Sequence, residues 1–301
     1  MNSFITQVKI MIKKIFNVIT ISTLFLVSIN SQANSLNLAW QTTGFQQPES
    51  IVKAVNNEGY YVSNINGQPS AVDGNGYISL VANDGTIKTL KWLEGMNAPK
   101  GMAVHGNTLY VSDINELLVI DIPTASINHR YSTHDKSFLN DVAVNSDGMV
   151  YVSDTANNRI YSLKGKQFEI WLDDVRLENP NGLYIDNEYL MVSSWGQQID
   201  NNWNTDIPGH ILLVSQKNKQ IQDFVNNTPI GNLDGLIKLT KQQFLVTDWM
   251  NGKLIKVSTN GQTKTIMELG QGSADMLYDN NKKLLLIPQM LKNSLLAYTI
   301  K

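Results

Sequence analysis

The stretch most informative about the fold reads Asn140-Asp141-Val142-Ala143-Val144-Asn145-Ser146-Asp147-Gly148-Met149-Val150-Tyr151-Val152-Ser153-Asp154. Two short apolar runs flank a turn rich in Asn, Asp and Gly, which is the pattern of two antiparallel strands joined by a tight connection. The second run ends in a small residue followed by an acid. We expect this Ser-Asp ending, which recurs in the chain, to cap a turn.

The same phrase occurs six times along the chain. Aligned on the residue just before each first apolar run, here called the anchor, the copies begin at Glu49, Lys100, Asn140, Asn181, Asp234 and Ala274. A β-rich repeat with a spacing of roughly 40–45 residues is typical of β-propellers. No segment shows a sustained helical period. The sequence therefore predicts an all-β fold, a six-bladed β-propeller with four-stranded blades.

The last repeat ends before its fourth strand. Its third strand is expected near 295–300, where the chain stops, whereas residues 36–41 form a spare strand-like segment just before the first repeat. A propeller has to close its ring to protect its strand edges. We predict that the N-terminal segment completes the last blade; the alternative is a loose N-terminal tail.

Composition excludes several classes of function. Of the 301 residues, 42% are hydrophobic and 17% charged, and 24 basic residues face 26 acidic ones. This balance fits a globular protein and does not fit a nucleic-acid-binding protein. The absence of cysteine excludes disulfides, a thiol nucleophile and cysteine metal sites. Any metal must be held by Asp, Glu, Asn, His or the backbone.

The first 33 residues resemble an export signal. Lys9, Lys13 and Lys14 precede an apolar run at 15–29, and Ser31-Gln32-Ala33 follows with small residues at a cleavage position. The alternative is a membrane anchor, but the run is short for a span of about 20 residues. We therefore predict a signal peptide at 1–33, a propeller at 34–301, no membrane span after cleavage, and a periplasmic or secreted protein.

The anchors include a set of oxygen-bearing side chains. If the innermost strands all start on one face, the anchors surround the central channel at one level, and Glu49, Asn140, Asn181 and Asp234 become neighbours. Two carboxylates and two amide carbonyls are the ligands that hard divalent cations prefer. We predict one divalent metal ion, calcium in the first place, with magnesium or zinc as alternatives. The competing interpretations are strand capping, or Lys100 neutralising the two acids in place of a metal.

Aromatic residues gather near the expected mouth of this channel. Trp195 and Trp249 follow the second strands of the fourth and fifth repeats, and Trp203 lies in the long loop 196–209. Together they predict a substrate pocket with apolar walls. Packing between blades is an equally good explanation for Trp249. His134 precedes the third anchor and could reach the mouth as a proton shuttle, or it is simply solvated.

The chain resembles the senescence marker protein/gluconolactonase family of six-bladed propellers, and more loosely paraoxonases and NHL-repeat propellers. The resemblance covers residues 44–301 and is carried by four segments, Pro48-Glu49, Asn140-Asp141, Asn181-Gly182-Leu183 and Asp234-Gly235-Leu236. In that family the matching Glu, two Asn and Asp bind one divalent metal ion. The matching Asp is also the catalytic base of lactone hydrolysis.

Two residues depart from the family pattern. Sugar-lactone hydrolases of the family tend to carry an Arg at the position of Phe138, so an apolar substrate is expected here rather than a sugar acid. Lys100 places a cation beside the metal ligands, where it could steady a developing oxyanion. The resemblance implies a metal-dependent hydrolase of lactones or related small-molecule esters. The alternative is a non-catalytic propeller that binds a ligand or protein partner on its channel face.

Overall fold

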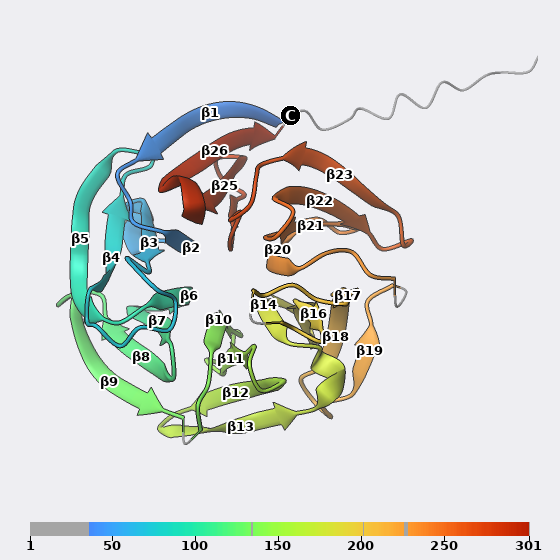
Figure 1. Cartoon of the computed structure of the whole chain (residues 1–301). Coiled ribbons are helices and arrows are strands. Elements are labelled where there is room, and N and C mark those ends of the chain that lie inside the picture. The colour runs from blue at the N-terminus through green and yellow to red at the C-terminus, as the bar shows by residue number, and fades with distance from the viewer. Residues whose placement is uncertain (1–35, 134, 201, 226–227, 301) are drawn as a thin grey trace, which may run out of the picture. The chain divides into compact units, whose positions relative to one another are not determined.

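The structure is a computed structural model that describes residues 36–133, 135–200, 202–225 and 228–300. Six four-stranded antiparallel sheets are arranged as blades around a central channel (Figure 1). This confirms the predicted six-bladed propeller. The predicted signal peptide, residues 1–33, lies outside the described residues. Within the described residues, no helix has the length and apolar character needed to span a membrane.

Each of the first five blades is built from one continuous stretch of chain. Blade 1 contains β2 (Pro48–Lys53), β3 (Tyr60–Asn64), β4 (Gly76–Val81) and β5 (Ile87–Met96). Blade 2 contains β6 (Pro99–His105), β7 (Thr108–Asp113), β8 (Glu116–Asp121) and β9 (Ser126–Ser132). Blade 3 contains β10 (Leu139–Val144), β11 (Val150–Asp154), β12 (Arg159–Lys164) and β13 (Gln167–Asp173).

The remaining blades follow the same order, with one insertion. Blade 4 contains β14 (Pro180–Asp186), β15 (Tyr189–Ser194), β18 (Ile211–Ser215) and β19 (Ile221–Asp223), with the small hairpin β16 (Gly196–Gln197) and β17 (Ile207–Pro208) inserted. Blade 5 contains β20 (Leu233–Thr240), β21 (Gln243–Asp248), β22 (Lys253–Ser258) and β23 (Thr263–Glu268). Three short 3-10 turns occur at Val55–Asn57, Val175–Leu177 and Met290–Lys292.

Blade 6 is completed by the N-terminal strand, as predicted. It contains β24 (Leu277–Asp279), β25 (Leu284–Gln289) and β26 (Ser294–Ile300), and β1 (Leu36–Thr43) is its outermost strand. β1 runs antiparallel to β26, from Leu36 opposite Ile300 to Thr43 opposite Ser294. The two ends of the propeller chain therefore share one sheet, which leaves no open gap between the last blade and the first.

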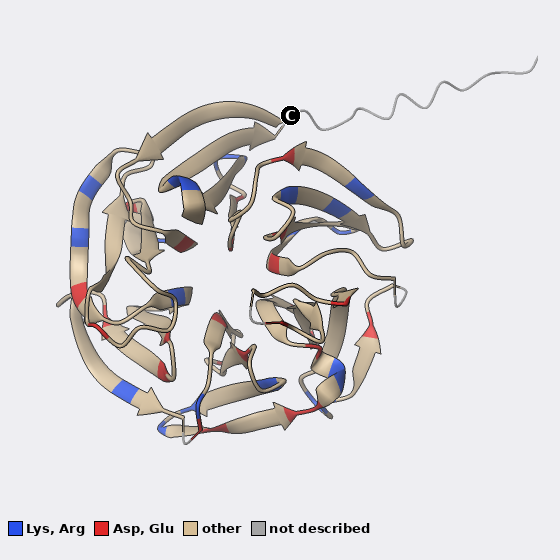
Figure 2. Ribbon diagram, viewed as in Figure 1, with Lys and Arg blue, Asp and Glu red and all other residues tan. Residues whose placement is uncertain are grey.

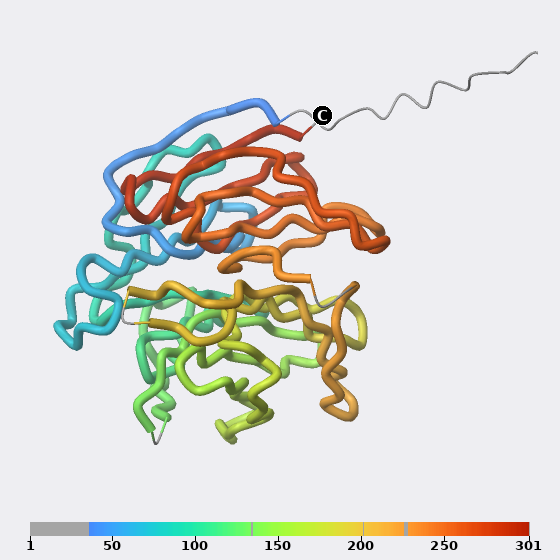
Figure 3. The backbone as a smooth tube through the Cα atoms, turned by 45° about the vertical axis from the view of Figure 1, so that its right-hand side comes forward, coloured from blue at the N-terminus to red at the C-terminus, as the bar shows by residue number. Residues whose placement is uncertain are grey.

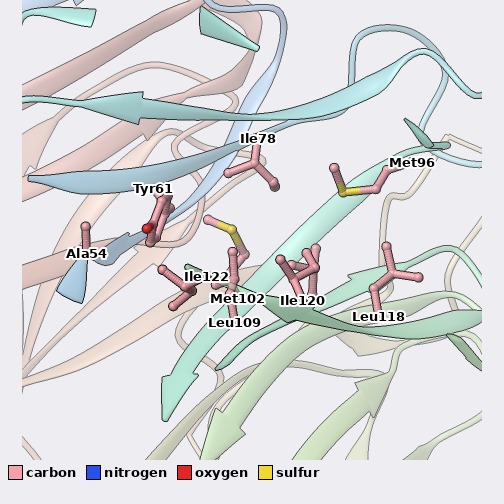
Figure 4. Close-up of a cluster of buried hydrophobic side chains, with 10 residues drawn as sticks. Ala54, Tyr61, Ile78, Met96, Met102, Leu109, Leu118, Ile120 and Ile122 are labelled. Carbon is pink, nitrogen blue, oxygen red and sulfur yellow. The ribbon is translucent and has the colours of Figure 1, made fainter. Parts of the chain in front are cut away.

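The hydrophobic core lies between the blades. The middle strands of each blade carry apolar side chains on both faces of the sheet. Neighbouring blades therefore bury a common apolar cluster between their facing sheets. Between blades 1 and 2, Tyr61 and Ile78 pack against Met102, Leu109 and Ile120 (Figure 4). A corresponding cluster lies at each of the other five interfaces. These interfaces fix the angles between blades, and thereby the positions of the innermost strands around the channel.

Candidate functional site

The five polar anchors of the sequence line one cavity of about 220 Å³. They lie on the innermost strands of blades 1 to 5, in the order Glu49, Lys100, Asn140, Asn181 and Asp234. All five are at least nine-tenths buried. Figure 2 shows charged residues at the channel ends of β2, β6, β10 and β20. The structure thus brings the predicted ligand set together, and we call Glu49, Asn140, Asn181 and Asp234 the oxygen cluster.

A β-bulge at the anchor of each innermost strand accounts for this convergence. In blade 3 the pairing of β10 with β11 is interrupted between Leu139 and Val142, so Asn140 falls inside the irregular segment. The pairing shifts at the anchor in blades 1, 2, 4 and 5 as well. A bulge locally bends a strand and redirects a side chain, and bulges are frequent beside active sites. The repeated bulge turns each anchor toward the channel.

Glycine after the anchor allows the bulges to approach one another closely. A Cβ atom on Gly182 would lie 2.1 Å from the main-chain oxygen of Asp234, and one on Gly101 would lie 2.4 Å from the Cα of Asp141. Neither distance is compatible with a side chain. Glycine at these positions therefore lets each blade's anchor segment lie directly against the anchor segment of the next blade.

Hydrogen bonds between blades hold the main chain of every member of the oxygen cluster. Ser112 donates to the carbonyl of Asn140, Ser153 to that of Asn181, and Ser193 to that of Asp234. The carbonyl of Glu49 accepts from the backbone N–H of Asp275 at 3.0 Å. Each of these donors belongs to the neighbouring blade, so the recurring Ser does more than cap a turn within its own blade.

The acid that follows these serines holds the segment entering its own blade. Asp154 accepts a hydrogen bond from the backbone N–H of Phe138 at 3.0 Å, and Asp113 accepts one from Ala98 at 2.7 Å. This is the expected capping role. It fixes the position two residues before the anchor, which is where Phe138 stands.

The amide groups of the oxygen cluster leave their oxygens available. Asn181 Nδ2 donates to the carbonyl of Leu233 at 3.1 Å, and Asn140 Nδ2 donates to Thr155 Oγ1 at 3.4 Å. Asn181 Oδ1 and Glu49 Oε2 are buried and have no hydrogen-bond partner among the described residues. Unpaired buried oxygens are costly. A divalent cation bound to them would remove that cost, so these residues fit a metal ion.

The negative charge near the channel exceeds what Lys100 can balance. Asp141, which is buried, and Asp275, which is half-buried, each lie directly after an anchor and bring the acidic side chains in and beside the oxygen cluster to four. Burial is the main cause that raises the pKa values of Glu49, Asp141 and Asp234 well above their ordinary values, and neighbouring acids raise these values further. Burial likewise raises the pKa of Asp275 to about 6. A cation bound beside these acids would lower their pKa values and stabilise the ionised carboxylates.

No three acidic, His or Cys side chains of the described residues meet closely enough to chelate a metal on their own. The amide oxygens of Asn140 and Asn181 would have to complete the coordination of Glu49 and Asp234. Such a mixed carboxylate and amide set is typical of calcium and magnesium sites rather than zinc sites.

Lys100 points toward the wall of the cavity. Its ammonium donates to the carbonyl of Ala98 at 3.1 Å and lies 4.4 Å from the centre of the Phe138 ring. Burial lowers the pKa of Lys100 to about 8, against the opposing effect of Glu49. Within the described chain it forms no salt bridge with Glu49 or Asp234. The geometry therefore does not match the alternative in which Lys100 replaces the metal.

Aromatic rings form the wall above the oxygen cluster. Phe138, Trp195, Trp203 and Trp249 all line the cavity. The ring centres of Phe138 and Trp203 are 5.0 Å apart, and Trp195 lies 6.0 Å from Trp203 and 5.9 Å from Trp249. Trp249 therefore faces the cavity as well as its neighbours. His134, expected near the mouth, lies outside the described residues.

Two loops complete the mouth of the cavity. The loop after β3 contributes Ile65 and Pro69, and the loop between β16 and β17 contributes Trp203. Both project on the same side of the ring (Figure 3). Sequence reasoning missed Met250, Gln271 and Met290, which also line the cavity, and it missed the role of Asp141 and Asp275. The signal for the two acids was their shared place directly after an anchor.

No protein-family model matches the chain, and no curated protein matches its sequence. Solved structures do resemble it. A gluconolactonase from Xanthomonas campestris is 15% identical, with a TM-score of 0.68 over 89% of this chain and 90% of that one. Virginiamycin B lyase from Staphylococcus aureus is 14% identical, with a TM-score of 0.61 over 89% and 100% of the two chains. A streptogramin B lyase is 12% identical, with a TM-score of 0.62 over 89% and 98%.

At these identities the likeness concerns the fold, and the chemistry has to be argued from the cavity. The expected resemblance to gluconolactonases holds at that level. The chain is a six-bladed propeller, similar in fold to the gluconolactonase and to the two lyases.

Proposed function

We propose that the protein is a metal-dependent hydrolase of lactones or related small esters. The observation that carries this proposal is the oxygen cluster, in which Glu49 Oε2 and Asn181 Oδ1 are buried without a hydrogen-bond partner in the described part of the chain, beneath a pocket with apolar walls. A pocket with apolar walls, a few convergent polar groups and perturbed pKa values is the usual form of an active site. The similarity in fold to a gluconolactonase agrees with this reading.

Glu49, Asn140, Asn181 and Asp234 would hold the metal ion. When bound, a calcium or magnesium ion supplies a Lewis acid that polarises the carbonyl of the substrate. Glu49 and Asp234 supply the negative charge for it, and the two amides supply neutral oxygens. The hydrogen bonds from neighbouring blades fix the main chain that carries these four side chains, so little reorganisation is needed when the charge on the substrate changes.

Asp234 is the proposed general base. A water molecule adds to the acyl carbon of the substrate while its proton passes to the Asp234 carboxylate. The bond between the acyl carbon and the ring oxygen then breaks, and the proton held by Asp234 passes to the departing oxygen. Burial and the nearby Asp275 raise the pKa of Asp234, which makes its carboxylate a stronger base than an exposed aspartate.

Lys100 is the proposed partner of the developing oxyanion. Its ammonium lines the same cavity as Asp234 and has donors left beyond the one given to Ala98. A buried cation near the reacting carbonyl stabilises the negative charge that appears in the transition state.

The direct test is a panel of lactones and aryl esters, assayed with calcium, with magnesium, and after removal of metal by EDTA. The proposal requires turnover that depends on metal and is lost in Asp234→Asn. Because two of the structural neighbours are lyases, the reaction should be run in water enriched in oxygen-18. Hydrolysis places one heavy oxygen in the product carboxylate, whereas an elimination places none.

A second candidate is a propeller that binds a ligand without turning it over. The observation in its favour is Lys100, whose ammonium is already engaged by Ala98 and Phe138. This candidate predicts tight binding of a lactone or ester that is recovered unchanged after long incubation. Mass spectrometry of the recovered ligand separates the two functions.

We also propose export to the periplasm or the medium, since residues 1–33 combine a basic start, an apolar run and a small-residue cleavage site. Mass spectrometry of the exported protein should find an N-terminus at Asn34. An intact N-terminus in that fraction would contradict this.

A further inference from the structure

We propose that the ligand carries a neutral apolar group of about the size of one aromatic ring, bound against Phe138, Trp195 and Trp203. This inference rests on the proposed function for the position of the reacting carbonyl, which would lie over the oxygen cluster. The class of the apolar group is argued independently, from the walls of the same cavity.

Two of the tryptophan rings, those of Trp195 and Trp249, offer carbon surfaces to the cavity. Trp195 Nε1 donates to the carbonyl of Trp203 at 3.0 Å, and Trp249 Nε1 donates to Met290 Sδ at 3.2 Å. Both indole N–H groups are thus occupied within the protein. What remains for a ligand is the ring faces and edges, which favour another ring in a tilted or offset arrangement.

The rest of the wall is equally poor in hydrogen-bonding groups. Ile65, Pro69, Met250 and Met290 line it, and its polar members above the oxygen cluster are Asn202 and Gln271. Asn202 and Gln271 are exposed at the rim. A polyhydroxylated sugar lactone would lose water from its hydroxyl groups here without gaining partners, which is strongly unfavourable. The wall therefore selects against sugars.

The position of Lys100 argues for a neutral ligand. Aromatic rings also attract organic cations, so a cationic ligand has to be considered. The face of Phe138, however, already carries the Lys100 ammonium at 4.4 Å. With a divalent ion balancing the oxygen cluster, a further cation beside Phe138 would meet the like charge of Lys100 in a buried setting, where repulsion is poorly screened.

The aromatic wall is fixed by hydrogen bonds from blade 5. Asn232, two residues before the anchor Asp234, donates to the carbonyl of Trp195 at 2.9 Å and to Thr205 Oγ1 at 2.8 Å. These bonds tie the loop that carries Trp203 to the blade that carries Asp234. The wall and the oxygen cluster are therefore parts of one preformed pocket, and the apolar group and the reacting carbonyl must belong to one small molecule.

The volume sets the size of that molecule. An apolar cavity of about 150 Å³ holds one benzene molecule. The cavity here, about 220 Å³, has room for such a ring together with a small lactone or ester group. A long acyl chain would not fit within it.

Binding of lactams tests this inference without requiring turnover. The probes are 2-pyrrolidinone, its 5-phenyl derivative, a derivative with an N-methylpyridinium ring of the same size, and gluconolactam. Calorimetry should show that the phenyl lactam binds the calcium-loaded protein about 10- to 100-fold more tightly than 2-pyrrolidinone, the range expected for moving one phenyl ring from water into an apolar pocket. We call this ratio of affinities, relative to 2-pyrrolidinone, the margin. The pyridinium lactam and gluconolactam should show no such margin.

Variants locate the effect. Trp203→Ala and Phe138→Ala should each remove most of the margin between the phenyl lactam and 2-pyrrolidinone, because the phenyl ring of the ligand loses its contact. Trp203→Phe, which keeps an aromatic face, should retain most of it. The matched control is Trp171→Ala, on β13 at the outer edge of blade 3, where Trp171 packs on Tyr151. It should lower stability and leave the margin intact.

Equal binding of the phenyl and unsubstituted lactams, or tighter binding of the pyridinium or sugar lactam, would overturn the inference. So would a margin that survives in both Trp203→Ala and Phe138→Ala. The proposed function fails separately. If the phenyl lactam binds as expected and no lactone or ester is hydrolysed, the hydrolase is wrong and the ligand class stands.

Discussion

The hydroxyl of Ser153, on β11 of blade 3, donates a 2.6 Å hydrogen bond to the main-chain carbonyl of Asn181, on β14 of blade 4. The same hydroxyl accepts the backbone N–H of Asp141 at 2.8 Å. One side chain thus connects two neighbouring anchor segments. Because corresponding serines hold Asn140 and Asp234, the oxygen cluster is positioned by contacts between blades.

Ser153→Ala should weaken metal binding by loosening Asn181. The substitution leaves the carbonyl of Asn181 and the N–H of Asp141 without their partner, and a loss of this kind costs about 1–3 kcal/mol. We expect lower calcium affinity by roughly tenfold, measured by calorimetry, since second-layer contacts to metal ligands commonly matter by about 10–100-fold.

Two further variants distinguish a role of Ser153 in positioning Asn181 from a general contribution to the stability of the fold. Ser153→Thr keeps the hydroxyl and should restore affinity, as the chain itself uses Thr247 at the matching position of blade 5. Thr247 donates to the carbonyl of Ala274, an anchor that is not in the oxygen cluster. Thr247→Val should therefore lower the melting temperature without changing calcium affinity. Equal losses of affinity in Ser153→Ala and Thr247→Val would count against a positioning role.

Lys100→Met should leave the fold intact and impair turnover. The ammonium of Lys100 bonds to a backbone carbonyl and forms no salt bridge with Glu49 or Asp234 among the described residues, so its removal does not break an ion pair. Loss of one positive charge should tighten calcium binding. Loss of the proposed oxyanion partner should lower kcat by about 10²–10³.

Thermal melts with and without calcium, together with lactone assays, check the Lys100 prediction. If Lys100→Met instead unfolds the protein, and calcium does not stabilise the wild type, then Lys100 takes the place of the metal and the binding propeller becomes the better account.

The stability of the metal-free protein should fall as pH rises. Burial raises the pKa of Asp275 from 3.8 to about 6, so the folded state holds this proton more tightly than the unfolded state does. The stabilising contribution is complete below the unfolded pKa and is lost as pH rises through about 6. Glu49, Asp141 and Asp234 shift in the same direction.

Melting temperatures in EDTA at pH 5 and pH 7 measure this effect. We expect the lower value at pH 7, and calcium should restore stability most strongly there, because the ionised carboxylates bind it and bound metal stabilises the folded state by mass action. Asp275→Asn should reduce the difference between the two pH values. A melting temperature in EDTA that is equal or higher at pH 7 would contradict the charge arrangement described here.

Asp234→Asn should preserve the shape of the site and remove the proposed base. The amide keeps an oxygen for the metal, so calcium binding should weaken and still be measurable. The rate of lactone hydrolysis should fall by about 10²–10⁴, as is usual when a proton-transfer group is lost. Hydrolysis at the wild-type rate in a folded, metal-loaded Asp234→Asn protein would assign the base to another residue.

The fold was predictable because it depends on a local pattern repeated six times. Each copy specifies a strand, a turn and a second strand, and the recurrence of such copies, each long enough for four strands, is typical of a ring of blades. The pairing of β1 with β26 followed from a missing strand at one end and a spare one at the other. These arguments need only periodicity and turn chemistry, which the sequence displays directly.

For the site, the sequence predicted which residues share the channel but not the directions of their side chains. Equivalent anchors had to meet, whatever the details of packing. The direction of Lys100 toward Phe138 depends on the bulge in β6 and on the adjacent blade, and neither is visible in a local pattern. The inter-blade role of Ser153 was hidden for the same reason, since its partner Asn181 lies in the next blade. Met250 and Met290 show no pattern that separates wall from core.

The most direct test of the oxygen cluster is the amount of calcium bound by the metal-stripped protein, measured by calorimetry for the wild type and for Glu49→Gln. Glu49→Gln removes one of two ligand carboxylates and keeps the size of the side chain. The account predicts one calcium ion per chain in the wild type and an affinity at least tenfold lower in Glu49→Gln, with both proteins folded. Absence of calcium and magnesium binding in the wild type, or binding that Glu49→Gln leaves unchanged, would contradict it.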